Sequence, residues 1–128
     1  MIYIVDSYAW IEYFLGSKKG EMLKTLFLDD KNHFLTLACC LAEIHGWTLK
    51  HNQNFDTLLK IIRANSTITN IEEHDWITAA EQRFAQRKTQ PDFGFIDAVL
   101  LAKQMEFQCS IISGDKHFKY LKNLMFLV

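Results

Sequence analysis

A three-layer α/β/α fold with a central parallel sheet is the architecture that this sequence predicts. Short runs rich in β-branched and aromatic residues, such as 2–5 and 33–37, alternate along the chain with longer helical segments. These runs are apolar throughout, which is typical of parallel strands covered by helices on both faces. The chain of 128 residues is 49% hydrophobic and has no Pro/Ser-rich linker, so we expect a single domain spanning 1–128.

The elements follow one another in a strand–helix order. The run "IYIV" (2–5) predicts a buried first strand, and the next segment predicts a helix with Ser7 as N-cap and Gly16 as its end. The later segments predict helix 20–30, strand 33–37, helices 38–51 and 54–65, a weak strand at 66–71, helices 72–88 and 93–106, strand 109–112, a short helix at 115–121 and strand 124–128.

Charge, cysteines and the N-terminus exclude several classes of protein. The net charge is −1 and the pI about 6.5, so any nucleic-acid binding must be local. Cys39 and Cys40 are adjacent, Cys109 leaves an odd number, and no CxxC occurs, which favours a reducing cytoplasm with the thiols in the core. Neither a signal peptide nor a membrane span is expected, because no apolar run approaches ~20 residues.

Two acidic residues directly follow predicted strands. Asp6 comes after "IYIV", and Asp115 comes after "CSIISG". In open α/β sheets, ligands bind in the crevice beyond the carboxyl ends of the strands. Both residues also fit the alternative role of a helix N-cap, because strand–Asp–helix is a common junction.

Two further acids lie in apolar segments. Glu43 is the only Asp, Glu, Lys or Arg between Lys31 and Lys50, and its helical neighbours are mostly apolar. Asp97 is the single charge in "FGFIDAVLLA". A structural salt bridge to a distant cation is one explanation for each, although no cation faces Asp97 within one helical turn.

One arrangement explains all four carboxylates together. Clustered buried carboxylates are tolerable only with protons or cations, and Mg²⁺ or Mn²⁺ prefers such oxygen ligands. A cage of this kind can position a phosphodiester and activate a water. We therefore predict a metal site that is also the catalytic site, formed by four residues: Asp6, Glu43, Asp97 and Asp115.

The four motifs "IYIVDSYAWIEYF", "TLACCLAEIHG", "FGFIDAVLLA" and "SIISGDKHF" resemble in order and spacing those of PIN-domain ribonucleases, and most closely those of VapC-type toxins. The resemblance covers essentially the whole chain. It implies a PIN-like fold, Mg²⁺- or Mn²⁺-dependent endonucleolytic cleavage of RNA, a homodimer and inhibition by a cognate antitoxin. The chain departs from the pattern at Tyr8, where Asn or Ser is common, and at His117, where another acid is common.

The resemblance also suggests a role for each acid of the site. Asp6 and Asp97 would be the principal metal ligands, with Glu43 and Asp115 completing the cage and Glu43 accepting a proton from the attacking water. In-line attack would release a 3′-hydroxyl and a 5′-phosphate.

Several residues near the acids are expected to bind the substrate. Ser113 is expected to orient a carboxylate or phosphate, and Lys116 to contact the RNA backbone. Asp92 and Glu12 remain open between a site role and a structural one. The cluster of Arg83, Arg87 and Lys88 has the same status, since a solvated helix face explains it equally well.

Two other functions stay open at this stage. A phosphohydrolase with a phosphorylated aspartate after the first strand would need a second Asp where the chain has Tyr8. The other is a PIN-like module that binds RNA or protein without cutting, which the presence of all four acids disfavours. Metal-dependent RNA cleavage separates an enzyme from such a module.

Overall fold

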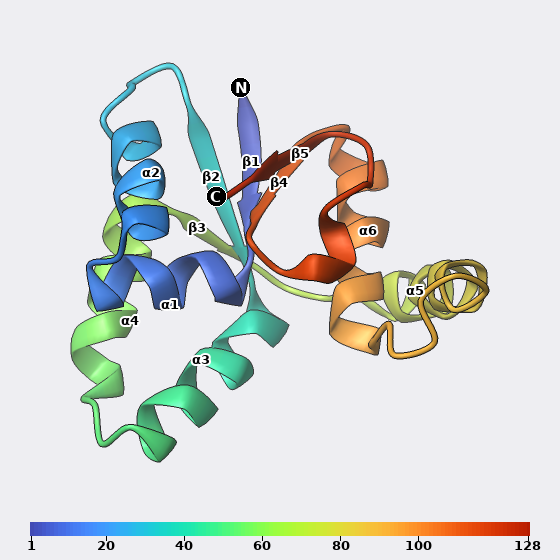
Figure 1. The fold of residues 1–128 in the computed structure, drawn as a ribbon, viewed down its shortest axis with the longest axis horizontal. Helices are drawn as coiled ribbons and strands as arrows, with labels where there is room; N and C mark the ends of the chain where they lie inside the picture. Colours follow the sequence, from blue (N-terminus) through green and yellow to red (C-terminus); the bar gives the residue numbers. More distant parts are fainter.

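The computed structural model describes residues 1–128 and contains one five-stranded sheet (Figure 1). All neighbouring strands are parallel, in the order β3-β2-β1-β4-β5. The central strand β1 pairs with β2 and β4, so that Ile4 lies opposite Leu35 on one side and Ile111 on the other. The strands are β1 (Ile2–Val5), β2 (His33–Leu37), β3 (Thr67–Thr69), β4 (Ser110–Ser113) and β5 (Leu124–Phe126).

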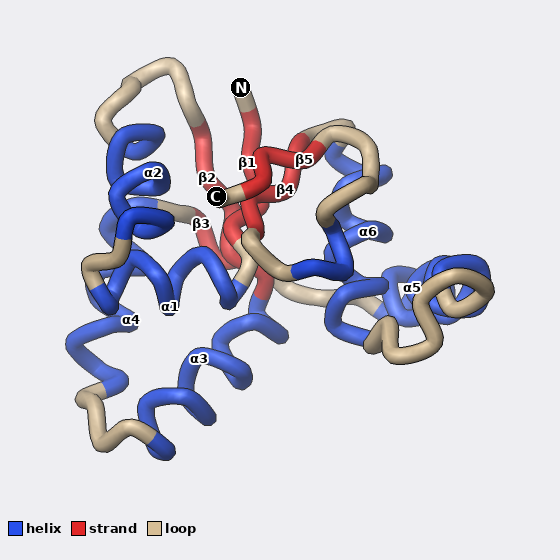
Figure 2. The backbone as a smooth tube through the Cα atoms, in the orientation of Figure 1, coloured by secondary structure: helices blue, strands red, loops and turns tan.

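Helices cover both faces of this sheet, which confirms the predicted three-layer fold (Figure 2). Alternate residues of β1 point to opposite faces: Tyr3 and Val5 pack in one core with α1 to α4, and Ile4 packs in the other with α5 and α6. The helices are α1 (Ser7–Leu15), α2 (Lys18–Phe27), α3 (Ala38–Lys50), α4 (Phe55–Asn65), α5 (Glu73–Gln86) and α6 (Phe95–Phe107), and a 3₁₀ turn η1 spans Lys116–Phe118.

The structure corrects three local predictions. Asp6, and not Ser7, caps α1, because the Asp6 carboxylate accepts the hydrogen bond from the Ser7 backbone N–H. The helix expected from residue 93 begins at Phe95 with Gly94 as N-cap, and Phe93 is a buried core residue before it. The helix expected over 115–121 is only the 3₁₀ turn η1.

An ion pair buried between α5 and α6 was not predicted. Lys103 Nζ lies 2.7 Å from Asp75 Oδ2, and the two side chains are only 3% and 2% exposed. Lys103 also contacts Glu106, whereas the carboxylate of Asp75 accepts a hydrogen bond from the Glu72 N–H at the start of α5. Burial raises the pKa of Asp75, but the hydrogen bonds from Lys103 and the Glu72 N–H, together with the charge of Lys103, outweigh burial and leave the pKa lowered.

The helices of this fold are too short or too polar to cross a bilayer.

Candidate metal centre

The four predicted acids lie at or near the ends of neighbouring strands. Asp6 directly follows β1, and Asp115 comes two residues after β4, which pairs with β1. Glu43 lies on α3, which begins directly after β2 on the other side of β1. The parallel order therefore delivers three acids to one edge of the sheet, and Asp97 joins them from the N-terminal turn of α6.

Asp6 is the most buried of these carboxylates, with 4% of the residue exposed. Its Oδ1 accepts a hydrogen bond of 2.8 Å from the Ser7 N–H, and its Oδ2 accepts one of 2.7 Å from the Ser113 hydroxyl. The pKa of Asp6 is raised from 3.8 to about 7, chiefly by burial and also by the charges of Glu43 and Asp97, against the lowering effect of the hydrogen bond from Ser113. A carboxylate in this position is costly to ionise unless a cation joins it.

Glu43 is tied to Asp6 through Ser7. The Ser7 hydroxyl donates to Glu43 Oε1 at 2.8 Å and lies 3.4 Å from Asp6 Oδ1. Glu43 is an exposed residue, which corrects the expectation of an apolar buried face around it. Partial loss of hydration at its carboxyl still raises the pKa of Glu43, and the charges of Asp97 and Asp115 add to this.

Asp97 is placed by the start of α6. Its Oδ2 accepts a hydrogen bond of 3.1 Å from the Gly94 N–H, and it is the one acid in the first turn. The positive end of the helix dipole favours a negative charge there. Partial burial nevertheless raises the pKa of Asp97, since it outweighs the Gly94 hydrogen bond.

Asp115 caps the 3₁₀ turn and contacts a histidine. Its Oδ1 accepts from the His117 N–H at 2.8 Å and lies 2.8 Å from His117 Nδ1. The N-cap roles considered for Asp6 and Asp115 are therefore both present in the structure. Capping uses only one carboxylate oxygen of each residue, so it leaves room for a second role.

The candidate donors form two groups, each with its ligand atoms within 4.8 Å of one another: Asp6, Cys40 and Glu43, and Asp97, Asp115 and His117. No Lys or Arg forms an ion pair with any of the four predicted acids, and only His117 lies close to Asp97 and Asp115. The structural salt bridges considered for Glu43 and Asp97 are therefore absent. The donor set fits a hard divalent cation, because carboxylate oxygens predominate in it.

Solved structures share this fold over nearly the whole chain. The chain superposes on the Mycobacterium tuberculosis toxin VapC20, described as cleaving the sarcin–ricin loop, with a TM-score of 0.76 and 15% identity over 94% of this chain and 95% of that one. A chain of the Rickettsia felis VapBC2 complex with a promoter DNA fragment gives 0.74 and 16% over 98% and 97%. A chain of a toxin–antitoxin complex from Klebsiella pneumoniae gives 0.68 and 19% over 98% of both chains.

The chain has the VapC toxin fold. This confirms, at the level of the fold, the resemblance seen in the four acidic motifs. No family model matches the sequence, and no curated protein does either. The roles of individual residues in this VapC-like chain are therefore argued from its own geometry.

Ser113 and Lys116 differ sharply in their access to a substrate. Ser113 is fully buried, donates to Asp6 Oδ2 and accepts from the Asp115 N–H at 3.0 Å. Its hydroxyl therefore orients the Asp6 carboxylate, which is one of the two roles expected of it, and a direct contact with the substrate stays a prediction. Lys116 is 80% exposed and lies 3.7 Å from Asp92 Oδ2, so it is free to reach a phosphate and stays a predicted substrate contact.

The contacts of Tyr8 with Lys19 and Gly114 were not predicted from the sequence. The Tyr8 hydroxyl accepts a hydrogen bond of 2.8 Å from Lys19 Nζ, and the Tyr8 ring packs so closely on Gly114 that a Cβ there would collide with it. Glycine is therefore required beside Asp115. Glu12, by contrast, hydrogen-bonds to Ser17 in the turn after α1 and turns away from the acids.

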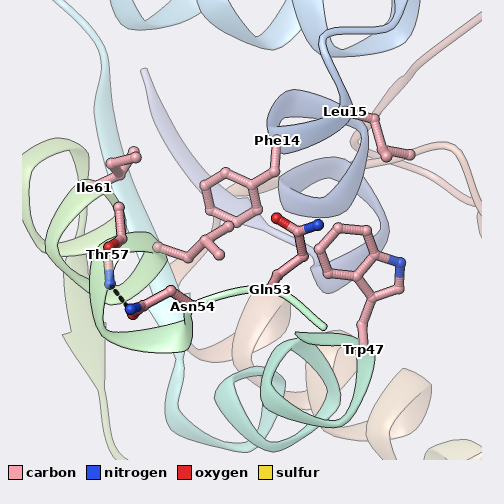
Figure 3. Close-up of a pocket in the computed structure, with 8 residues that line it drawn as sticks. Phe14, Leu15, Trp47, Gln53, Asn54, Thr57 and Ile61 are labelled. Carbon is pink, nitrogen blue, oxygen red and sulfur yellow. Dashed lines mark hydrogen bonds between the residues drawn. The ribbon is translucent and has the colours of Figure 1, made fainter. Parts of the chain in front are cut away.

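The largest cavity of this VapC-like chain lies away from the acids. It is a groove of about 420 Å³ between α1, α3 and α4, lined by residues including Phe14, Trp47 and Ile61 (Figure 3). None of the four acids lines this groove or any other cavity. The acidic site is consequently a shallow surface, which suits a polymer better than an enclosed small molecule.

The raised pKa of Asp6 predicts how stability depends on pH. A carboxyl group whose pKa is higher in the folded than in the unfolded chain favours the folded state at low pH. The metal-free protein should therefore lose stability from this group as the pH rises from about 4 to about 7, by at most about 4 kcal/mol.

The comparison that isolates this effect is the pH profile of unfolding for wild type against Asp6→Asn. Glu43 and Asp97, whose pKa values are also raised, contribute to the pH dependence of the unfolding free energy in both proteins, as do all other titratable groups. The free-energy difference between the two proteins should thus grow in favour of Asp6→Asn between pH 4 and 7. If the difference in unfolding free energy between wild type and Asp6→Asn does not change with pH, the pKa of Asp6 is not raised in the folded protein.

Proposed function

We propose that this protein is a metal-dependent endoribonuclease that hydrolyses RNA phosphodiester bonds, and that it is the toxin of a type II toxin–antitoxin pair. The observation that supports this most strongly is a buried Asp6, surrounded by other carboxylates and matched by no Lys or Arg. The VapC fold adds support, because VapC20, with the same fold, is described as an RNA-cleaving toxin.

The acids would hold the cation. Asp6 and Asp97 are proposed as principal ligands of Mg²⁺ or Mn²⁺, with Glu43 and Asp115 completing the set directly or through waters. The bound cation would lower the pKa of a coordinated water and stabilise negative charge on the phosphate.

The protein side chains prepare this site before substrate arrives. Ser113 and the Ser7 N–H each hold one oxygen of Asp6, so the carboxylate has a fixed orientation. Glu43 Oε1 accepts from the Ser7 hydroxyl, which leaves Oε2 of this exposed residue to take a proton from the attacking water. The raised pKa of Glu43 suits a general base, because it improves proton affinity near neutral pH.

Cations at the rim would hold the RNA backbone. Lys116 extends into solvent beside Asp92, and Lys19 lies against Tyr8 two residues beyond Asp6. Displacement in line with the leaving oxygen would give a 3′-hydroxyl and a 5′-phosphate. The overall charge of −1 makes RNA binding depend on these local contacts, so we expect its affinity to fall with salt only as far as these few phosphate contacts dictate.

The proposed partners follow from the same argument. Two of the structures with this fold come from complexes, the Rickettsia felis VapBC2 complex and the Klebsiella pneumoniae toxin–antitoxin complex, so we propose a cognate antitoxin for this chain. A homodimer and a cytoplasmic location are proposed with it. An open reading frame for a small DNA-binding protein next to the gene would support the antitoxin.

Removal of metal is expected to stop cleavage. The purified chain, incubated without antitoxin with single-stranded and stem-loop RNA, should cut RNA with Mg²⁺ or Mn²⁺ and stop when a chelator is added. Addition of Mg²⁺ or Mn²⁺ in excess should restore cutting. If no RNA is cut with metal present, while direct binding of RNA or of a protein persists, the chain is a non-catalytic PIN-like module instead.

A further inference from the structure

We propose that His117 is a third protein ligand of the cation held by Asp97 and Asp115, and that its nitrogen makes the site prefer Mn²⁺ to Mg²⁺. The inference rests on the proposed function, because it concerns the same acidic site. It adds a ligand and a metal preference that the four acids alone do not provide.

The distances among the three side chains suit a shared cation. His117 Nδ1 lies 2.8 Å from Asp115 Oδ1 and 3.6 Å from Asp97 Oδ2. With bonds of about 2.1 Å in octahedral geometry, adjacent donor atoms are separated by roughly 3 Å. All three donors lie within 4.8 Å of one another, so side-chain adjustments can bring them together as neighbouring ligands on one face of an octahedron.

The imidazole ring is held with Nδ1 toward the acids. Its other nitrogen, Nε2, is buried and lies 3.1 Å from Asp92 Oδ2. The ring meets Phe93 edge to face with centroids 5.7 Å apart, and Gln90 donates to the His117 backbone carbonyl at 2.9 Å. A carboxylate near the second ring nitrogen is the usual environment of a metal-binding histidine. Here Nε2 makes no hydrogen bond, so the packing on Phe93 and the Gln90 contact to the backbone hold the ring in place.

The rest of the site offers oxygen donors. The Cys40 thiol is near Asp6 and Glu43, but it is fully buried, and a sulfur donor is a soft ligand that neither Mg²⁺ nor Mn²⁺ favours. His117 is therefore the one nitrogen donor among the carboxylates. Imidazole binds first-row transition metals much better than Mg²⁺, which prefers oxygen and water.

Pulsed electron paramagnetic resonance of the Mn²⁺-loaded protein tests this directly. Nitrogen coordinated to Mn²⁺ produces a ¹⁴N modulation that carboxylate and water ligands do not. We expect the modulation in wild type, its loss in His117→Gln and its persistence in His51→Gln, which changes an exposed histidine at the end of α3. Gln is chosen because it keeps a polar group near Asp92 without a donor at the Nδ1 position.

Calorimetric titration with Mn²⁺ and Mg²⁺ measures the preference. His117→Gln should weaken Mn²⁺ binding about 10- to 100-fold and change Mg²⁺ binding by less than about threefold. Absence of ¹⁴N modulation in wild type overturns the inference, and so does tighter Mn²⁺ binding by His117→Gln, which would mean that the histidine competes with the cation. If either of these results is found while RNA cleavage still depends on metal, the His117 inference fails and the nuclease assignment stands. If the protein neither binds Mn²⁺ nor cleaves RNA, both the inference and the nuclease assignment fail.

Discussion

Replacement of Asp97 by asparagine is expected to lower RNA cleavage by about two to three orders of magnitude while the fold is retained. Asp97 is proposed as a principal metal ligand, and it also accepts a hydrogen bond from the Gly94 N–H at the start of α6. The side-chain oxygen of Asn can still accept this hydrogen bond, so the fold should be kept. Loss of one negative charge relieves repulsion with Asp115 and Asp6, which should balance or exceed the lost helix-dipole interaction. Initial rates at saturating Mg²⁺, with unfolding curves of the metal-free protein, measure both effects.

The matched control is Asp56→Asn. Asp56 is likewise an acid in the first turn of a helix, but it is exposed and its helix is α4, which contributes none of the acids. Its substitution should leave cleavage within about twofold of wild type, because only a surface charge changes. Asp97→Asn cutting as fast as this control would show that Asp97 does not take part in the reaction.

Among the substitutions discussed, Asp75→Asn should lower the free energy of unfolding the most, by about 3 kcal/mol, and it leaves the acidic site unchanged. The substitution leaves the buried Lys103 ammonium with only the half-exposed Glu106 as a charged partner. The side-chain oxygen of Asn can still accept the hydrogen bond from the Glu72 N–H, so the loss reports on the charge and not on the helix cap. Denaturant unfolding of the metal-free protein gives the value.

Two further variants distinguish the loss of the ion pair from a general effect of substitutions on the packing of α5 against α6. Glu106→Gln removes the more exposed partner of Lys103 and should cost less than about 1 kcal/mol. Combining Asp75→Asn with Lys103→Met removes both buried charges and should recover most of the stability, because an apolar side chain replaces the unpaired ammonium. No recovery in the double variant would mean that the cost arises from packing around Asp75 instead.

Local sequence was sufficient for the elements and for the strand-end acids. The apolar runs 2–5 and 33–37 form β1 and β2 with those bounds, since a strand buried on both faces needs an unbroken apolar run. Asp6 and Asp115 were located by position alone, because the residue just beyond a parallel strand lies at the ligand-binding edge whatever the details of packing.

Side-chain burial near the site was harder to predict. Glu43 lies among apolar neighbours in sequence, yet it is an exposed residue although Cys40, one turn before it, is fully buried. Ser113 seemed accessible after a strand, but its hydroxyl is enclosed between Asp6 and the Asp115 N–H. Hydrophobic pattern reports which face of an element is apolar on average, and says little about a single side chain at its end.

The sequence by itself determined the parallel α/β architecture and the edge of the sheet at which the acids gather, because both depend on the order of apolar and polar residues along the chain. Tertiary structure alone decided that Lys103 pairs with Asp75 and that the His117 ring faces Asp97 and Asp115. Each of these contacts joins two elements that are distant in sequence. The distance between the contacting atoms therefore depends on how α5, α6 and the turn after β4 pack together, and no local sequence pattern encodes this packing.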